Sequence, residues 1–389
     1  MSKHILCVSE LGAGAGHIAP LVKVAQAMLA QDPSLAISFA VQNPSMAYAM
    51  FGESGFEFLP SPYHPPDGAG QSRTGSYSEI LGHFGYLRKD LLSTVLRSWD
   101  GLLASIKPDV ILADHSPTAC LAARGRYPVA LIGNGFTVPP CDMTEFPAFR
   151  LGMSAPQMQP MMRDVINKLL NQRAQPELPT LPALLATELR GVFAVPQTDP
   201  YGRLRKDPLL GSYNGAITPL PAKEDGSVFL YCGLQIEQLA QIVEATLELG
   251  RPVEAFVGPY NSPAQQLLLG FGAKVHLTTP NLQDMLSQSN MVVHTAGAGL
   301  AQAALQAGRP QLCLPIHLES RMTATGMRDL NVALSVDMST DENKLSDAMR
   351  AVSEVQSFTR NAQAVAHDIA RLPLPKDPAA HFGAQVLAL

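Results

Sequence analysis

Residues 5–20 have the sequence ILCVSELGAGAGHIAP, in which a short apolar run leads into a glycine-bearing turn and then into an amphipathic helical pattern. The apolar run predicts a buried strand. Further runs rich in Val, Ile and Phe alternate with longer helical patterns along most of the chain. This alternation is typical of an α/β protein with a doubly wound parallel sheet covered by helices on both faces.

The alternation occurs in two blocks, separated by a proline-rich segment without sustained periodicity. The expected strands are 4–9, 36–41, 109–113 and 128–132 in the first block, and 228–232, 252–257, 273–277, 291–293 and 311–314 in the second. We therefore expect an N-terminal Rossmann-like domain over 1–205, a linker over 206–225 and a C-terminal Rossmann-like domain over 226–370. A final helix over 371–389 is a candidate for packing back on the first domain.

The composition excludes several classes of protein. Hydrophobic residues make up 46% and charged residues 16% of the 389 residues, whereas roughly 25% charged residues are usual in soluble domains. This balance excludes a disordered chain and predicts extensive burial. The 28 Lys and Arg residues and the 33 Asp and Glu residues give a net charge of -5, so nucleic acid is excluded as the main ligand.

The cysteines and the apolar runs indicate the compartment. The five cysteines show no CxxC or Cys/His ligand spacing, so the sequence predicts neither a disulfide framework nor a structural zinc site. No apolar run approaches the roughly 18 residues that a spanning helix needs. The first residues, MSKH, show no signal-peptide pattern. We expect a cytoplasmic protein without integral membrane association.

The glycine-bearing turn lets the backbone approach a ligand closely, because glycine carries no side chain. A dinucleotide-binding fingerprint is one alternative for this turn. Its GxGxxG spacing does not fit Gly12, Gly14 and Gly16. Residues 41–43 (VQN), which follow the next strand, lack the acid that binds the ribose in such sites. An NAD site therefore stays a weak alternative.

His17 follows this turn and is a candidate general base, because an imidazole titrates near neutral pH. The alternative is a histidine that only hydrogen-bonds the loop. Asp114 follows the expected strand 109–113 and would emerge at the same edge of the sheet as His17. Its carboxylate could hold the other imidazole nitrogen. Asp114 is an equally good candidate for the N-cap of the next helix, and the two roles are compatible.

A second set of small and polar residues follows two buried strands of the C-terminal block. Residues 291–300 (MVVHTAGAGL) pass from a strand through small residues into an Ala-rich helix, whose first backbone N–H groups suit a diphosphate. Tight packing of a helix on a strand requires the same small residues. Residues 303–321 (AALQAGRPQLCLPIHLESR) lead through another buried strand to a polar cluster at the same edge.

Together these motifs resemble GT-B glycosyltransferases of the nucleotide-sugar-dependent, GT1-like family, which includes UDP-glucuronosyltransferases and bacterial antibiotic and macrolide glycosyltransferases. The strongest part is 294–322, which is similar to the family's donor signature of a His, a Gly-rich turn, an Ala-rich helix, a Gly-x-Pro and an acid-amide pair. Residues 16–20 (GHIAP) match the family's Gly-His-x-x-Pro, and 228–233 (VFLYCG) resemble the strand that opens its donor domain. The resemblance implies two Rossmann-like domains that face a cleft.

The resemblance also implies residue roles. His17 would deprotonate the acceptor, and Asp114 would orient His17. The residues implied in donor binding are Gly16, Gly233, His294, Thr295, Gly297, Ala298, Gly299, Leu300, Gln302, Glu319 and Ser320. Of these, His294 and the backbone of 297–300 would hold the diphosphate. Gln302 lies where plant members place a ribose-binding Glu, and Glu319 and Ser320 would face the sugar hydroxyls.

The chain departs from the family pattern at three places. Leu300 replaces the hydroxyl residue often found at the start of the donor helix, so one phosphate contact is lost. Glu319 and Ser320 replace the usual Asp-Gln pair, and Cys232 replaces the common Ser or Phe before the glycine. These departures bear on the identity of the donor more than on the fold.

The expected acceptor walls are the segments 60–86 and 146–170, which combine apolar residues with scattered polar ones, and the second contains several Met residues. The candidate acceptor-binding residues are His64, His83, Phe84, Phe136 and Met158. Ordinary core packing of the Met residues, Met153 among them, and surface positions for His64 and His83 are the alternatives. The apolar residues favour a phenol, polyketide or other natural product as acceptor.

We therefore expect a metal-independent inverting glycosyltransferase that uses a UDP- or dTDP-sugar as co-substrate, without a further cofactor. No Asp-x-Asp motif is present that would hold a divalent ion, and a helix N-terminus with His294 would stabilise the leaving diphosphate. A catalytically silent sugar-nucleotide-binding protein or partner subunit is one alternative, and a sugar-nucleotide epimerase is another. The sugar, the acceptor, the bond atom and the oligomeric state stay open.

Overall fold

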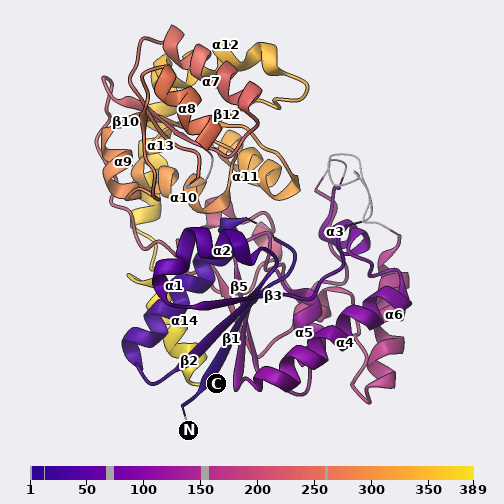
Figure 1. Cartoon of the computed structure of the whole chain (residues 1–389). Helices are drawn as coiled ribbons and strands as arrows, with labels where there is room; N and C mark the ends of the chain where they lie inside the picture. The colour runs from indigo at the N-terminus through magenta and orange to yellow at the C-terminus, as the bar shows by residue number, and fades with distance from the viewer. Residues whose placement is uncertain (1, 13, 67–73, 150–156, 259–261) are drawn as a thin grey trace. The chain divides into compact units, whose positions relative to one another are not determined.

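The computed structural model describes residues 2–12, 14–66, 74–149, 157–258 and 262–389, and the chain divides into two compact units (Figure 1). The first unit comprises Met1–Phe193, Tyr201–Tyr213 and Asp377–Leu389. The second unit comprises Ala194–Pro200 and Asn214–Lys376. Neither unit is therefore one continuous stretch of chain. The predicted linker over 206–225 contains the crossing between Tyr213 and Asn214.

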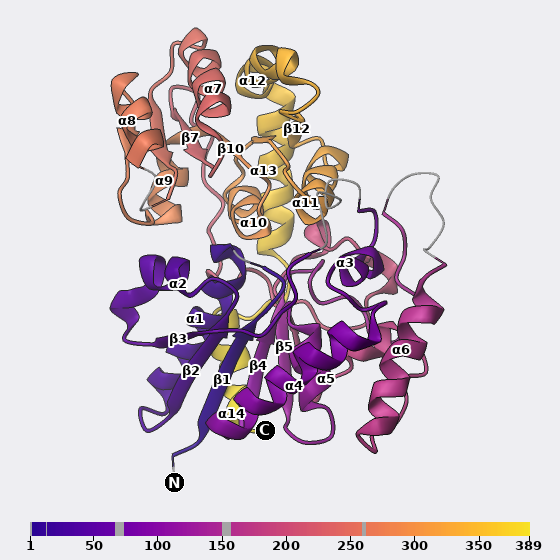
Figure 2. The ribbon, with the colours of Figure 1, turned by 45° about the vertical axis from the view of Figure 1, so that its right-hand side comes forward.

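The first unit is built on a six-stranded parallel sheet in the order β3-β2-β1-β4-β5-β6. Its strands are β1 (His4–Ser9), β2 (Ala36–Val41), β3 (Glu57–Pro60), β4 (Val110–Asp114), β5 (Val129–Gly133) and β6 (Leu189–Val192). Its helices are α1 (Ala15–Gln31), α2 (Pro44–Phe51), α3 (Tyr77–His83), α4 (Lys89–Ile106), α5 (Pro117–Ala123), α6 (Gln159–Gln172) and α14 (Pro378–Leu387), with 3₁₀ turns η1 (Gly52–Ser54), η3 (Pro182–Leu185) and η5 (Gly202–Leu204). In Figures 1 and 2, α1 and α14 lie on one face of the sheet and α4 and α5 on the other.

The second unit repeats this architecture. Its six parallel strands follow the order β12-β11-β10-β7-β8-β9, the same order as in the first unit when counted from β7. The strands are β7 (Ser227–Tyr231), β8 (Val253–Phe256), β9 (Lys274–Val275), β10 (Ser289–His294), β11 (Gln311–Cys313) and β12 (Ala333–Ser335). The helices are α7 (Ile236–Glu248), α8 (Ser262–Gly270), α9 (Leu282–Gln288), α10 (Ala298–Ala307), α11 (Leu318–Asp329), α12 (Leu345–Glu354) and α13 (Gln356–Ala370), with η4 (Pro196–Thr198) and η6 (Glu342–Lys344). The predicted class, two Rossmann-like α/β domains, is confirmed.

In each sheet the strand order reverses at one point, between β1 and β4 in the first and between β7 and β10 in the second. At these points Ser9 is in register with Asp114, and Tyr231 is in register with His294. Ligands of open α/β sheets bind outside the carboxyl ends of the strands at such a reversal. The candidate residues of both sequence blocks therefore lie where this architecture favours binding.

The sequence patterns identified the central strands but missed β3, β6 and β12. All three are edge strands of three or four residues. β3 ends in Pro60, and β6 contains Arg190 and Gly191. Such short strands have too few apolar residues for a periodic pattern, and their residue types are common in loops. In the described part of the chain, no helix combines the length and the apolar character needed to cross a bilayer.

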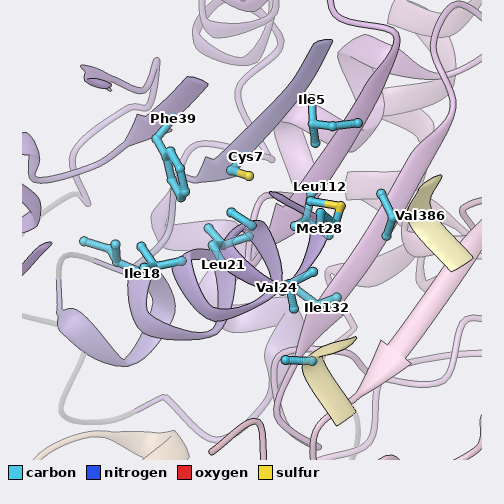
Figure 3. Close-up of a cluster of buried hydrophobic side chains, with 14 of the residues drawn as sticks. Ile5, Cys7, Ile18, Leu21, Val24, Met28, Phe39, Leu112, Ile132 and Val386 are labelled. Carbon is cyan, nitrogen blue, oxygen red and sulfur yellow. The ribbon is translucent and has the colours of Figure 1, made fainter. Parts of the chain in front are cut away.

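The last helix, α14, completes the hydrophobic core of the first unit. Val386 is fully buried and lies close to Met28 and Leu112, as Figure 3 shows. Phe382 belongs to the same cluster. Gly191 provides the space for this ring, because a Cβ there would lie 2.5 Å from it. The C-terminal segment is thus an integral part of the first unit.

We expect Phe382→Ala to lower the free energy of unfolding of the first unit by about 3–5 kcal/mol, the usual cost of removing a large aromatic side chain from a core. Trp99 is the single tryptophan and is fully buried in this unit, so its fluorescence during urea unfolding reports on this unit. Leu389→Ala, at an exposed position of the same segment, is the control and should cost less than about 0.5 kcal/mol. A loss below about 1 kcal/mol for Phe382→Ala would contradict the role of α14 in the core.

Candidate functional site

His17 and Asp114 form a hydrogen-bonded pair at the carboxyl edge of the first sheet. The Nδ1 atom of His17 lies 2.9 Å from Oδ1 of Asp114. His17 is in the first turn of α1, and Asp114 is the last residue of β4. The Asp114 side chain is 2% exposed and that of His17 is 15% exposed. When Nδ1 carries the proton and donates a hydrogen bond to the carboxylate, Nε2 is the nitrogen that can take a proton from another group.

Gly12 provides the space that the His17 ring occupies. A Cβ added to Gly12 would lie 1.9 Å from Cδ2 and 2.4 Å from Nε2 of His17. A Cβ added to Gly14 or Gly16 would meet no atom within 4 Å. Gly16 was predicted to bind the donor, and in the structure it is exposed directly before His17. The glycine at position 12 is therefore a requirement of the imidazole position.

His115, which the sequence analysis did not single out, lies next to this pair. Its ring centroid is 5.2 Å from that of His17 and 5.6 Å from that of Tyr77. Its backbone is left-handed, with φ 45°, and its carbonyl accepts the N–H of Leu11 at 3.1 Å. A non-glycine residue in this region is strained, and such strain collects at functional sites. Its place directly after Asp114 at a strand end was the one signal in the sequence.

Aromatic rings continue from His115 towards the predicted acceptor wall. The ring of Tyr77 lies 6.0 Å from that of Phe136 and 4.9 Å from that of Phe146. Phe136 was predicted to bind the acceptor, and in the structure it is 3% exposed and lies within this cluster. The structure therefore connects Phe136 to His17 through Tyr77 and His115.

The other predicted acceptor residues are more dispersed. Met158 packs near α3, since a Cβ on Gly82 would lie 3.6 Å from its Sδ. His83 ends α3 and Phe84 follows it, both half-buried. The Nδ1 atom of His64 is buried without a hydrogen-bond partner among the described residues. Met153 and the wall segments 67–73 and 150–156 lie outside the described residues.

His294 ends β10 and is 1% exposed. Its Nε2 lies 2.8 Å from Oε1 of Gln311, and its Nδ1 accepts the N–H of Ala296 at 3.0 Å. Burial lowers the pKa of this imidazole to about 4, so the ring is neutral at pH 7. His294 was expected to contact a diphosphate, but both of its nitrogens bond within the second unit. There it holds the turn at Ala296, whose φ is 58°.

The start of α10 follows that turn. Gly297 is the N-cap of this ten-residue helix and, as a glycine, makes no side-chain cap bond to its first N–H groups. A Cβ on Gly297 would meet no atom within 4 Å, so packing inside the unit does not require glycine there. Thr295, Ala298 and Gly299 are half-buried, and the Leu300 side chain is buried. The N–H groups and the dipole of this helix suit an anion such as a diphosphate.

The remaining predicted donor residues differ in their surroundings. Ser320 was expected to face the sugar, but it is 1% exposed, and its Oγ accepts the N–H groups of Ile316 and His317, each at 3.0 Å, in the cap of α11. Gln302 is 2% exposed, and its Nε2 has no partner among the described residues. Glu319 is half-buried in the first turn of α11, and Gly233 is exposed after β7. Among the residues that the structure describes, no three His, Cys, Asp or Glu side chains form a group that could hold a metal ion.

Comparisons with known proteins show what the chain as a whole is similar to. Residues 274–384 match the family model described as the C-terminal domain of erythromycin biosynthesis protein CIII-like proteins. The elloramycin glycosyltransferase ElmGT of Streptomyces olivaceus is 26% identical over 290 residues, covering 71% of this chain and 68% of the relative. The structure of the spinosyn rhamnosyltransferase SpnG, 17% identical, aligns over 100% of both chains with a TM-score of 0.68. The chain is a glycosyltransferase with the GT-B fold.

Further solved structures share this fold. The calicheamicin glycosyltransferase CalG4 is 18% identical and aligns over 100% of this chain and 98% of its own, with a TM-score of 0.68. SpnG has also been solved complexed with thymidine diphosphate and with spinosyn aglycone, with TM-scores of 0.67 and 0.68. The resemblance to GT1-like natural-product glycosyltransferases that the motifs indicated is confirmed.

We expect Gly12→Ala to reduce the turnover of the glycosyltransferase by about 100-fold, because the new methyl group displaces the His17 ring and a shift of about 1 Å has such an effect. Gly14→Ala is the matched control, since its methyl group enters open space. Steady-state rates measure the loss of turnover, and the imidazole NMR signals of His17 measure the displacement of its ring. Equal rates for the two variants would contradict the steric role of Gly12.

The neutral state of His294 predicts a pH dependence of stability in the second unit. The unfolded imidazole binds a proton below about pH 6.5, whereas the folded one does so only below about pH 4. The contribution of neutral His294 to the free energy of unfolding is therefore fully present above about pH 6.5. It falls, by up to about 3 kcal/mol, as the pH is lowered to about 4. Hydrogen exchange of β10 and β11 peptides measures this loss. His294→Asn keeps an acceptor for the N–H of Ala296 but cannot titrate, so its stability should depend less on pH between about 4 and 6.5. An unchanged pH dependence of stability in this variant would contradict the role of His294.

Proposed function

We propose that this glycosyltransferase transfers a sugar from a UDP- or dTDP-sugar to an apolar small-molecule acceptor, with inversion and without a metal ion. The hydrogen bond of 2.9 Å between His17 and Asp114 carries this proposal. It is the arrangement in which a buried carboxylate fixes the imidazole tautomer and stabilises the imidazolium that forms.

In the proposed reaction, the acceptor atom attacks the anomeric carbon while its proton moves to Nε2 of His17. The bond from the anomeric carbon to the nucleotide diphosphate breaks, and the diphosphate leaves with the electron pair. Attack from the face opposite the leaving group inverts the configuration at that carbon. Asp114 keeps Nδ1 protonated, so that Nε2 presents its lone pair to the acceptor.

The second unit would bind the donor. The first turn of α10 offers backbone N–H groups and the positive end of a helix dipole, which favour the negative charge that develops on the departing diphosphate. His294 would maintain the Ala296 turn at the start of this helix, as its bonds to Ala296 and Gln311 suggest. The SpnG complex with thymidine diphosphate supports a pyrimidine nucleotide as the carrier.

An apolar acceptor is supported by the residues around the base. In space, the ring of His17 neighbours that of His115, His115 neighbours Tyr77, and Tyr77 neighbours Phe136. The rings of Tyr77 and Phe136 form a mainly apolar cluster. The SpnG complex with an aglycone and the similarity to ElmGT support a natural product as the acceptor class. The proposal includes a cytoplasmic location, in keeping with five cysteines that are all free.

A catalytically silent nucleotide-sugar-binding protein is the second candidate. Leu300 supplies no hydroxyl to a phosphate, and the Ser320 hydroxyl is engaged in the cap of α11. Such a protein would bind UDP or dTDP in calorimetry and would never consume a UDP- or dTDP-sugar when a panel of phenolic and polyketide acceptors is present. Any transfer product eliminates this candidate.

We expect His17→Ala to reduce the turnover number by about 10²–10⁴-fold, the range that general-base catalysis contributes. Asp114→Asn should also reduce it, because an amide no longer enforces the productive tautomer. Nucleotide binding, measured by calorimetry, should stay within about twofold for both variants. His381→Ala is the control, since His381 is exposed on α14, whose Ala380 carbonyl bonds to Gln31 at the opposite end of α1 from His17. Unchanged turnover in His17→Ala would reject the proposed base.

A further inference from the structure

The carboxylate of Glu10 is a second acidic group at the carboxyl edge of the first sheet, and the proposed reaction does not use it. Glu10 follows β1 directly and is fully buried. Its Oε1 accepts the backbone N–H of Thr118 at 2.7 Å, and its Oε2 accepts that of Ala119 at 3.1 Å. Both N–H groups belong to the first turn of α5, whose N-cap residue Ser116 makes no side-chain cap bond. Glu10 therefore caps a helix that is distant in sequence.

A fully buried carboxylate is costly unless hydrogen bonds and favourable charge offset its loss of water. Here two N–H groups and the positive end of a helix face it. Burial nevertheless raises the pKa of Glu10 to about 7. An apolar side chain at this position would leave both N–H groups of α5 without a partner. The side chain is thus suited to holding two segments together rather than to filling space.

The two segments that Glu10 joins are those that carry the catalytic pair. Glu10 begins the segment that leads from β1 to His17, and α5 begins three residues after Asp114. Beside it, the N–H of Leu11 donates to the carbonyl of His115 at 3.1 Å. These links join the same two segments as the hydrogen bond of 2.9 Å between His17 and Asp114. The separation of imidazole and carboxylate is therefore set partly by groups outside the pair.

We propose that Glu10 is a positioning residue for sugar transfer, whose carboxylate ties the segment after β1 to the start of α5 and so keeps Asp114 at hydrogen-bonding distance from His17. The inference rests on the proposed function, since it concerns the same base. Glu10 itself does not touch the substrates in this role.

Replacement by an isosteric amide tests the role of the carboxylate. Glu10→Gln leaves one acceptor oxygen for two N–H groups, and its NH₂ group faces the second of them. We expect kcat to fall about tenfold to 100-fold, since small displacements of catalytic groups have effects of this size, while the donor KM stays within about twofold. Glu188→Gln is the matched control, because Glu188 accepts the N–H of Val129 at 2.8 Å at the amino-terminal start of β5, on the opposite edge of the same sheet. Its kcat should stay within about twofold of the wild-type value.

A second substitution separates positioning from general damage. In an Asp114→Asn background the pair is already impaired, so Glu10→Gln should lower the remaining kcat by less than about twofold. If the damage were unrelated to the pair, the fold-losses of kcat caused by Glu10→Gln and by Asp114→Asn would multiply in the double variant. A full multiplicative loss therefore overturns the proposal, and so does a kcat of Glu10→Gln equal to that of Glu188→Gln.

The NMR signal of the His17 Nδ1 proton gives a readout that needs no turnover. It should shift or broaden in Glu10→Gln and stay in place in Glu188→Gln, and an unchanged signal in both overturns the positioning role. Turnover retained by His17→Ala would instead overturn the proposed function, while the NMR comparison still decides the role of Glu10. If Glu10→Gln fails to fold, Glu10→Asp replaces it, since this shorter carboxylate cannot reach both N–H groups. It should change the same signal, and wild-type behaviour would overturn the proposal.

Discussion

The hydrogen bond between His17 and Asp114 is the contact on which the chemistry proposed for the first unit depends. It forms because β1 and β4 end side by side where the strand order reverses, so that a residue just after one strand meets the last residue of the other. The ring also needs the space left by the missing side chain of Gly12. The geometry of a polar pair is therefore decided by the register of apolar strands and by one glycine.

The two units use the same strand order for opposite electrostatic purposes. In the first, the carboxylates of Asp114 and Glu10 lie at the carboxyl edge of the sheet, where they accept hydrogen bonds from the His17 imidazole and from backbone N–H groups. In the second, the corresponding edge leads to a helix start whose N-cap residue, Gly297, has no side chain to cap the N–H groups, beside a neutral His294. This division matches the proposed reaction, in which one unit takes up a proton and the other binds an anion.

The sequence was sufficient for the central strands and for the pairing of His17 with Asp114, because apolar runs and the order of strands determine which residues reach one edge. It was not sufficient for side-chain direction. His294 and Ser320 occupy the motif positions expected of ligand-binding groups, yet their polar atoms bond inside the second unit. Glu10 was missed for a related reason, since its partner Thr118 lies 108 residues further along the chain. No local pattern distinguishes such an acid from one that faces water.

The placement of α14 in the first unit has a consequence for how this protein is made and altered. Ala379, Phe382 and Val386 of this segment belong to the first core, so during synthesis the earlier segments of the first unit lack these contacts until residues 377–389 have left the ribosome. For the same reason, a chimera that takes its second unit from a related protein needs junctions on both sides of that unit, with the original C-terminal helix restored. A simple fusion at the middle of the chain would pair the sheet of one parent with the closing helix of the other.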